Sequence, residues 1–444
     1  MIRAARPAFS AALPAALRHL AAVSGIVLGL SVLGLGIVGC GEPPEKTVAA
    51  PAREAVAGND KSVQASPRPV RDLDSASVRN FSLLLAGMVP AAERAALDPV
   101  WRRHAEAMDA LWREIEPQLR AMDAWAGDAM PGLAASPAPV FHPFAGPDPS
   151  SALVLFPEAT SYLLVGREAP GRLPMPESLA PGSPALEVLD GDLERLRAAF
   201  ATRAATGAFS RSEVAKAVTG SSFDGVLPAL LALLVRGGAL PLQIDYVSID
   251  AETLQIHELP DDQHVARAMR IVFADVGTEA LLAGPGATDE AVLDEAVGDA
   301  RQRIVYYFAR ELSNSGLFPH DPLHRLIAAQ PMLHVYMKSS EYLPHLREYS
   351  TFRELVLERA DAVLQDDSGL PLRSFTSDLW SVGLYGRYEE PTAVFHKFFQ
   401  EELAAAFARG SAAELPFRFG YRSSDEGGCL ILARRQQDES ASTG

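Results

Sequence analysis

Apolar side chains recur every three or four residues between residues 81 and 125, and charged residues occupy most positions between them. This spacing predicts amphipathic helices that bury one face. We therefore expect a helical hairpin within residues 75–135, in which Pro117 bends or divides the second helix. The same pattern predicts further helices at residues 189–205, 212–218, 225–236, 322–329, 349–361 and 391–409.

Short runs of alternating or β-branched apolar residues predict strands. Two of these runs, residues 152–156 and 160–166, flank a turn and are expected to form a hairpin. The other expected strands are residues 240–249, 264–275, 301–309, 332–337, 362–365, 372–375, 380–384 and 429–434, with the first two as neighbours. Because helices and strands alternate without a regular βαβ order, the pattern favours an α+β globular domain over residues 136–435. The polar tail, residues 436–444, is expected to fray.

The N-terminus of the chain has the order of a secretory signal peptide. A basic, acid-free segment precedes an uncharged apolar run at residues 20–38. That run is also long enough to span a bilayer, so an uncleaved anchor is the alternative. The segment from Leu35 to Gly41 resembles a bacterial lipobox. The resemblance implies cleavage after Gly39 and fatty acylation of Cys40, which would tether the chain to a bacterial membrane.

Two features refine this location. Gly41 follows the cysteine in place of the Asp that often retains lipoproteins in the inner membrane, so the outer membrane is favoured. Residues 40–74 are rich in Pro, Ala and charged residues, and they hold few large apolar side chains. Such a segment cannot bury enough surface to offset its ordering entropy, and we expect a flexible tether.

The mature chain is acidic and holds few cysteines. Removal of the leader takes away three arginines and no acid, which leaves 37 basic and 56 acidic residues and a net charge of −19. This balance argues against nucleic acid as a partner. Lipidation of Cys40 leaves Cys429 as the only thiol, so no internal disulfide can form. Cys429 begins an apolar run and is expected to be buried in a strand.

The segment Asp366-Asp367-Ser368-Gly369 is the best candidate for a site. Adjacent carboxylates on a tight turn can hold a divalent cation or sugar hydroxyl groups. The alternative is a structural turn, in which an Asp caps its own backbone and Gly369 takes a positive φ. Asp148, in Gly146-Pro147-Asp148-Pro149, poses the same choice. The aromatic residues Trp380, Tyr385 and Tyr388 could stack a sugar or a peptide, although aromatic residues on strands usually serve packing.

Other motifs give weaker signals. His320 and His324 have a spacing that can chelate zinc on a helix, but Pro322 places His320 before the helix. The chain has no Gly-x-Ser-x-Gly nucleophile motif and no Gly-Lys-Ser/Thr phosphate loop. The sequence therefore predicts no catalytic residues, no cofactor and no defined metal site.

Several segments together carry a family resemblance. They are Val140–Asp148, Phe156-Pro157 with Tyr162–Gly166, Gly225–Leu231, Tyr306-Tyr307-Phe308 with Leu312-Ser313-Asn314, and Leu364–Pro371. With their FxGPD and LQDDSGxP motifs, these segments resemble a family of bacterial exported proteins and lipoproteins of unknown activity. The resemblance covers residues 140–435 and implies no reaction, ligand or catalytic residue. Members of that family often have Tyr in place of His142 and Ser in place of Ala145.

These observations favour a lipid-anchored envelope protein that acts as a structural or binding module. Its expected partners are the membrane, through the N-terminal lipid, and an envelope protein or glycan. The alternative function is a lipid-anchored periplasmic or surface hydrolase with an acidic site, metal-dependent or not, built on Asp366 and Asp367. Whether Asp148, Asp366 and Asp367 lie together in one cleft distinguishes a shared site from separate turns.

Overall fold

The computed structural model describes most of the chain after residue 74. The described residues are 75–89, 94–144, 146, 148–173, 184–207, 221–259, 267–283, 290–298, 300–391, 393–410, 412–421 and 428–436. They belong to one compact unit, Ala65–Gly444. The expected signal peptide, Cys40, the tether, the helix at 212–218 and the tail from residue 437 lie outside the described residues.

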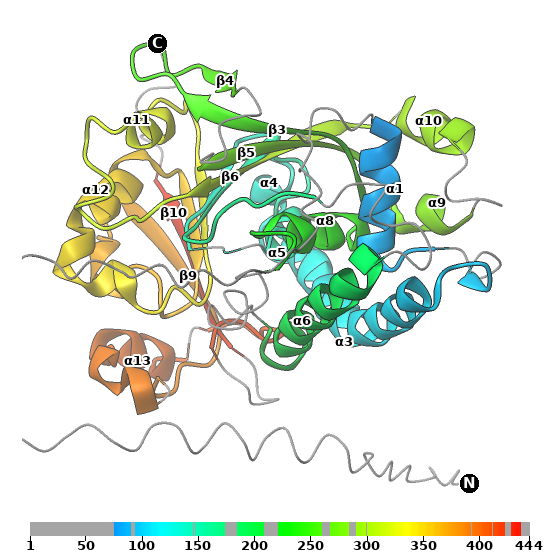
Figure 1. Cartoon of the computed structure of the whole chain (residues 1–444). Helices are drawn as coiled ribbons and strands as arrows, with labels where there is room; N and C mark the ends of the chain where they lie inside the picture. The colour runs from blue at the N-terminus through cyan, green and yellow to red at the C-terminus, as the bar shows by residue number, and fades with distance from the viewer. Residues whose placement is uncertain are drawn as a thin grey trace, which may run out of the picture. The chain divides into compact units, whose positions relative to one another are not determined.

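The described part of the chain combines helices and strands in a mixed α/β fold (Figure 1). The α-helices are α1 (Ser75–Ala86), α3 (Pro99–Ala129), α4 (Pro131–Ala134), α5 (Ser150–Leu155), α6 (Pro184–Thr206), α8 (Leu227–Arg236), α9 (Thr278–Ala283), α10 (Glu290–Gly298), α11 (Pro322–Ala328), α12 (Ser350–Arg359) and α13 (Glu401–Ala408). The 3-10 helices are η4 (Leu343–His345), η5 (Arg347–Tyr349), η6 (Leu372–Ser374) and η7 (Ala393–Phe398). The strands are β1 (Val140–His142), β2 (Ser161–Gly166), β3 (Ala239–Ile249), β4 (Ile256–Glu258), β5 (Ala268–Asp275), β6 (Gln302–Ala309), β7 (His334–Met337), β8 (Ala362–Gln365), β9 (Trp380–Gly386) and β10 (Cys429–Arg435).

The strands form one mixed sheet in the order β4-β3-β5-β6-β2-β1-β7-β8-β10-β9. The central strands β6, β2, β1, β7 and β8 are parallel to one another. Antiparallel strands flank them on both sides, with β5, β3 and β4 beyond β6 and with β10 and β9 beyond β8. The expected pairing of 240–249 with 264–275 is confirmed as the β3–β5 pair. Because the central strands are parallel, their carboxyl ends share one edge.

Helices cover both faces of the sheet. On one face, α1, α3, α5, α6 and α8 pack against side chains such as Tyr162 and Leu164 of β2 and Tyr307 of β6. All ten residues of α8 are buried, as the apolar run up to Val235 predicts, and the last of them is Arg236. On the other face, α11 and α12 pack against Leu163 of β2 and other residues of the central strands. The alternation of β2 side chains between two cores follows from the two-residue period of a strand.

Helix α3 runs without interruption from Pro99 to Ala129 although it contains Pro117. Of the two effects expected of that proline, a bend or a division, the division does not occur. Its Met and Trp side chains are buried in the core, as the helical spacing predicts. The side chain of Asp98 caps its first turn by accepting from the Val100 backbone N–H at 2.9 Å.

The predicted strand at residues 152–156 is wrong. Those residues lie in helix α5 and in its C-cap, Phe156, so the predicted hairpin does not form. The helix starts there because the Asp148 carboxylate accepts the backbone N–H and the hydroxyl of Ser150. This N–H belongs to the first turn and has no partner within the helix. A short apolar run fits a buried helix as well as a strand, and the surrounding contacts select the helix.

Two further element predictions are wrong. The segment at 372–375, expected as a strand, forms η6 and its C-cap, where Pro371 fixes φ before it and Gln400 Oε1 accepts the Leu372 N–H at 3.0 Å. The helix expected over 391–409 is divided into η7 and α13. The break follows the conformation of Gln400, which is extended and donates its backbone N–H to the Tyr388 hydroxyl at 3.0 Å.

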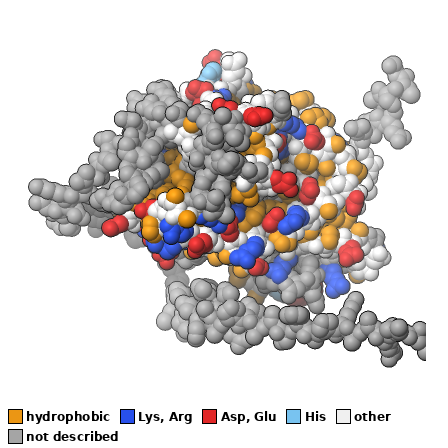
Figure 2. All heavy atoms as spheres, turned by 90° about the vertical axis from the view of Figure 1, so that its right-hand side faces the viewer, with side chains coloured by type: hydrophobic (Ala, Val, Ile, Leu, Met, Phe, Trp, Pro, Cys, Tyr) orange, Lys and Arg blue, Asp and Glu red, His pale blue; other side chains and the backbone are white. Residues whose placement is uncertain are grey.

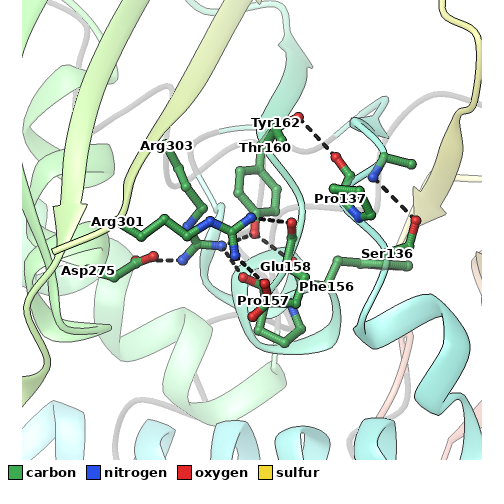
Figure 3. Close-up of polar contacts among 11 residues, drawn as sticks. Ser136, Pro137, Phe156, Pro157, Glu158, Thr160, Tyr162, Asp275, Arg301 and Arg303 are labelled. Carbon is green, nitrogen blue, oxygen red and sulfur yellow. Dashed lines mark hydrogen bonds and ion pairs between the residues drawn. The ribbon is translucent and has the colours of Figure 1, made fainter.

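Two arginines fix the connection that precedes β2 (Figure 3). The buried Arg303 of β6 donates to the Pro157 carbonyl at 2.8 Å, to the Tyr162 hydroxyl and to Asp275. Arg301 pairs with Glu158 in the same loop. The loop between α5 and β2 is therefore held to the antiparallel side of the sheet, which supports the position of α5 and of the residues before it.

The surface is chemically mixed. On the face that Figure 2 shows, acidic and basic side chains are interspersed with apolar ones. Among the residues that the structure describes, none of the helices combines the length and the hydrophobicity needed to cross a bilayer.

Candidate functional site

The segments that leave the carboxyl ends of β1, β7 and β8 contain several buried charged residues. Asp148 follows β1, Lys338 directly follows β7, and Asp366 directly follows β8. All three side chains are buried. In α/β sheets, ligands commonly bind at this edge, which makes the cluster the first candidate site.

Asp148 forms a buried ion pair. Its Oδ2 accepts Arg203 Nε at 3.0 Å, and its Oδ1 accepts the Ser150 backbone N–H at 3.1 Å. Arg203 also donates from Nη2 to the Ser150 hydroxyl at 2.7 Å. Burial acts to raise the pKa of Asp148, but the charges of Arg203 and Lys338 outweigh it and lower the pKa. Asp148 is therefore an ionised group whose hydrogen-bonding capacity is used within the protein.

Lys338 links the two acidic sites. Its ammonium donates to the Gly207 carbonyl at 2.5 Å and lies 5.9 Å from the centre of the Phe419 ring. Burial lowers its pKa to about 8, against the attraction of Asp148 and Asp366. Asp148 and Asp366 therefore act on the same ammonium group, although they are distant in the sequence.

The Asp366 carboxylate closes the turn after β8. Its Oδ1 accepts the Ser368 backbone N–H at 3.1 Å together with the Ser368 hydroxyl, and its Oδ2 accepts the Ser339 backbone N–H at 2.9 Å. Burial and the neighbouring Asp367 carboxylate raise the pKa of Asp366 to about 7, in spite of these hydrogen bonds. The expectation that an Asp caps its own backbone in this turn is confirmed.

Asp367 faces a different set of residues. Its carboxylate accepts the Tyr342 hydroxyl, and its backbone carbonyl accepts Gln400 Nε2 at 2.9 Å. The Tyr342 ring stacks on Phe398 of η7 with the centroids 5.1 Å apart. Asp367 therefore joins the turn to the η7–α13 segment, and it does not join Asp148 at Lys338.

The expectation of a positive φ at Gly369 is wrong. Gly369 is absent from the glycines with positive φ. The glycine is needed for space instead, because a Cβ there would lie 2.5 Å from Gln365 Oε1. Gln365 in turn spans the turn by exchanging two hydrogen bonds with the backbone of Leu370, at 2.6 and 2.8 Å.

Backbone strain occurs in the segment after β7. Ser339, Glu341 and Tyr342 all have positive φ, at 53°, 54° and 57°. The Tyr421 hydroxyl holds this segment by accepting the Glu341 N–H at 2.7 Å and donating to the Ser339 carbonyl at 2.8 Å. Within the described residues, the buried hydroxyls of Ser339 and Ser340 have no hydrogen-bond partner. Strain and unpaired polar atoms of this kind are common at functional sites.

The cluster of Asp148, Lys338 and Asp366 nevertheless leaves little space for a ligand. The cavity beside Lys338 and Arg203 has a volume of about 20 Å³, which is room for one water molecule. Among the described residues, no three His, Cys, Asp or Glu side chains are grouped to hold a metal ion. The cluster of Asp148, Lys338 and Asp366 is thus a filled polar network.

A second feature has the space that the cluster lacks. A groove of about 490 Å³ lies on the face of the sheet where α11 and α12 pack. Its floor is formed by β2, β5 and β6, through Ser161, Leu163, Arg270 and Tyr306. The β3–β4 hairpin forms one wall, and α11 with the segment after it forms another. A volume of this size is within the range of ligand sites, about 300–1,000 Å³.

The hairpin wall of the groove is ordered by its own hydrogen bonds. Asp250 Oδ1 accepts the backbone N–H groups of Glu252 and Thr253 at 3.0 and 2.7 Å. The Asp250 N–H donates to the Gln255 carbonyl at 2.9 Å, which closes the turn. Arg325 of α11 donates to the Ala251 carbonyl and so connects the two walls. The groove therefore exists before any ligand arrives.

The polar groups in the groove are mostly neutral. Arg270 carries the one basic charge of the floor, and it is paired with Asp245 at 2.7 Å and with Glu258 at 2.6 Å. Burial raises the pKa of Tyr306, so its hydroxyl keeps its proton and can donate. Among the described residues, the side chains of Ser161, Gln255 and Tyr306 have no hydrogen-bond partner. Their polar atoms are available to a ligand.

The sequence singled out the acidic turn but not this groove. Lys338 and Arg203 were also missed, although a Lys directly after a buried strand is a signal that could have been read. The aromatic strand serves packing: Trp380 is buried against Phe375, and Tyr385 contacts Trp125 edge to face. The Cys40 site lies outside the described residues.

The chain matches no family model, no curated protein and no solved structure.

Proposed function

We propose that this protein is a lipid-anchored binding module of a bacterial cell envelope, and that it holds its ligand in the groove between the β3–β4 hairpin and α11. The observation that carries the proposal is the preformed groove of about 490 Å³, whose wall turn is closed by the hydrogen bonds of Asp250. A site that is ordered in advance loses less free energy when the ligand binds.

The location is part of the same proposal. Residues 1–39 act as a lipoprotein signal peptide, Cys40 carries the acyl chains, and residues 40–74 connect them to a helical segment at 75–135 and an α+β domain at 136–435. Several acyl chains anchor a protein stably, whereas one chain alone binds a membrane only weakly. The tether gives the groove access to envelope material around the anchor. Gly41 favours the outer membrane.

Binding is preferred to the alternative, hydrolysis at the acidic turn. Asp148 and Asp366 accept hydrogen bonds from groups of the protein itself, and the cavity near them holds about one water molecule. A hydrolase needs space for a substrate beside its acid and base. The filled network therefore fits a structural role for the turn.

The anchor is tested by mass spectrometry of the protein extracted from membranes. We expect a mature chain that begins at an acylated Cys40, and a soluble chain when the Cys40→Ser variant is produced without residues 1–39. An unmodified chain that still begins at Met1 would contradict the anchor.

The groove is tested with the soluble Cys40→Ser chain, so that the lipid makes no contribution. Purified protein is sedimented with isolated envelope material from which lipids have been extracted. Gln255→Trp places a large ring in the groove, whereas Glu252→Trp changes an exposed side chain of the same turn that does not line the groove. We expect the first variant to lose sedimentation and the second to retain it. Equal sedimentation of both variants would contradict groove binding.

A further inference from the structure

The residues that line the groove indicate the chemical class of its ligand. An inference about that ligand rests on the proposed function, binding in the groove. We infer that the groove binds an uncharged oligosaccharide. The inference depends on three properties of the described residues: the paired charges, the half-buried aromatic ring of Tyr306 in the lining, and the neutral hydrogen-bonding groups around that ring.

The paired charges argue against an ionic ligand. The Arg270 guanidinium has two carboxylate partners, Asp245 of β3 and Glu258 of β4, and both bonds are short. Burial acts to lower the pKa of Arg270, but the two carboxylates outweigh it and raise the pKa. An anionic ligand would have to replace these partners, and a cationic ligand would meet a guanidinium. A neutral ligand has no such cost.

The aromatic ring provides the apolar contact. Tyr306 is half-buried in β6, next to Phe308, and the two ring centroids lie 6.2 Å apart. A pyranose ring has one face of C–H groups that can pack on a tyrosine ring, while the hydroxyl of the tyrosine remains free to hydrogen-bond. Leu163 and Leu326 extend this apolar surface.

Three of the remaining lining residues suit sugar hydroxyls. Ser161, Gln255 and Gln330 present hydroxyl and amide groups, which both donate and accept hydrogen bonds as sugar hydroxyls do. Gln330 Nε2 donates to the Leu326 carbonyl at 3.0 Å, which fixes the position of the amide. Amides and hydroxyls that converge around an aromatic ring fit a neutral polyhydroxylated ligand.

An extended peptide fits this groove less well. Peptides often bind by adding a strand to an exposed sheet edge, where backbone groups are unpaired. The floor of the groove is the face of β2, β6 and β5, and each of these strands is paired on both sides. The edge strand β4 contributes Ile256 and His257 to a wall. A ligand that lies on the floor is therefore recognised by side chains.

The test is calorimetric titration of the mature lipidated protein in detergent micelles with three uncharged trisaccharides: tri-N-acetylchitotriose, cellotriose and maltotriose. We expect at least one to bind with a Kd between about 10 μM and 1 mM. Tyr306→Ala should weaken binding about tenfold or more, since it removes the stacking surface. Gln255→Ala, at an exposed position that should not affect folding, should weaken it about threefold to tenfold. Glu252→Ala, on the same turn but outside the groove lining, should change it less than about twofold.

The outcomes separate this inference from the proposed function. If no trisaccharide binds at about 10 mM, the saccharide inference is overturned. If a trisaccharide binds equally well to the Tyr306→Ala and Gln255→Ala variants, the assignment to the groove is overturned. A third outcome is that Gln255→Trp abolishes sedimentation with envelope material but no trisaccharide inhibits the sedimentation of the parent chain. This outcome would leave the proposed function in place and refute the ligand class. If no trisaccharide binds and sedimentation does not depend on the groove, both the ligand class and the proposed function are refuted.

Discussion

Arg203 Nε lies 3.0 Å from Asp148 Oδ2, and the two side chains are only 4% and 10% exposed. Arg203 belongs to α6, whereas Asp148 lies between β1 and α5. The pair thus connects a helix that covers the sheet to the segment that leaves the carboxyl end of a central strand. Because Asp148 also caps α5 through Ser150, one carboxylate fixes three parts of the fold.

Removal of the arginine should destabilise the protein strongly. Arg203→Met leaves the Asp148 carboxylate buried without its guanidinium, and breaking one side of a buried pair costs about 3–5 kcal/mol of the free energy of unfolding. Urea unfolding followed by circular dichroism measures the loss. The control is Arg103→Met, whose pair with Asp190 is 56% and 34% exposed, and which should cost at most about 1 kcal/mol. Equal losses in the two variants would show that the Arg203 pair is not decisive.

The Asp366 pKa predicts a pH dependence with a definite sign. A folded-state pKa of about 7, against an ordinary value of 3.8, means that the folded chain binds more protons than the unfolded chain between pH 4 and 7. The contribution of Asp366 to the free energy of unfolding therefore falls as the pH rises through that window. Asp366→Asn cannot ionise, so its stability relative to the wild type should increase between pH 4.5 and 7.5, by on the order of 3 kcal/mol.

Unfolding curves of both proteins at the two pH values provide the test, because groups common to both cancel in the difference. Asp378→Asn serves as the control. Asp378 is exposed, and the Thr376 side chain lowers its pKa, so this variant should not gain stability relative to the wild type as the pH rises. A difference between Asp366→Asn and the wild type that does not vary with pH would mean that Asp366 titrates normally.

The sequence predicts much of the secondary structure, because a helix or strand that buries one face has apolar residues at regular intervals along the chain. Helices α3, α8 and α12 and strands β3, β6 and β10 lie near their predicted positions. The errors fall where another residue decides the backbone. Ser150 and Asp148 start a helix in a run that also fits a strand, and Gln400 divides a run that fits one helix. Such contacts depend on tertiary structure, which local periodicity does not contain.

The candidate sites were less predictable than the elements. Asp366 and Asp367 are adjacent in sequence, yet one acts on Lys338 and the other accepts from Tyr342. Adjacent residues at a turn point in different directions, so sequence proximity did not imply a shared site. The groove was not predicted because its lining comes from five separate elements. Only the strand order places Tyr306, Arg270 and Ser161 side by side.

A pair of glycines tests how tightly the acidic turn is packed. Gly420 and Gly410 have similar positive φ, at +85° and +76°. A Cβ at Gly420 would lie 2.7 Å from Asp366 Oδ2, whereas a Cβ at Gly410 would meet no atom within 4 Å. Gly410→Ala should cost about 1–2 kcal/mol from the left-handed backbone alone. Gly420→Ala should cost about 1–3 kcal/mol more, because Asp366 must move. Equal costs in chemical denaturation would show that Asp366 has room to shift.

The single thiol of the folded part allows a last prediction. Cys429 is 1% exposed in β10, which lies between β8 and β9 in the sheet. A thiol reagent such as Ellman's reagent should therefore react with the native protein only at the rate at which local or global unfolding exposes Cys429. Ser381→Cys, at an exposed position of the neighbouring strand, should add a second thiol that reacts at once. In urea the acylated wild-type chain should release one thiol equivalent, and the chain with an unmodified Cys40 should release two. Immediate reaction of the native wild-type chain, at the rate of the Ser381→Cys control, would contradict the burial of Cys429.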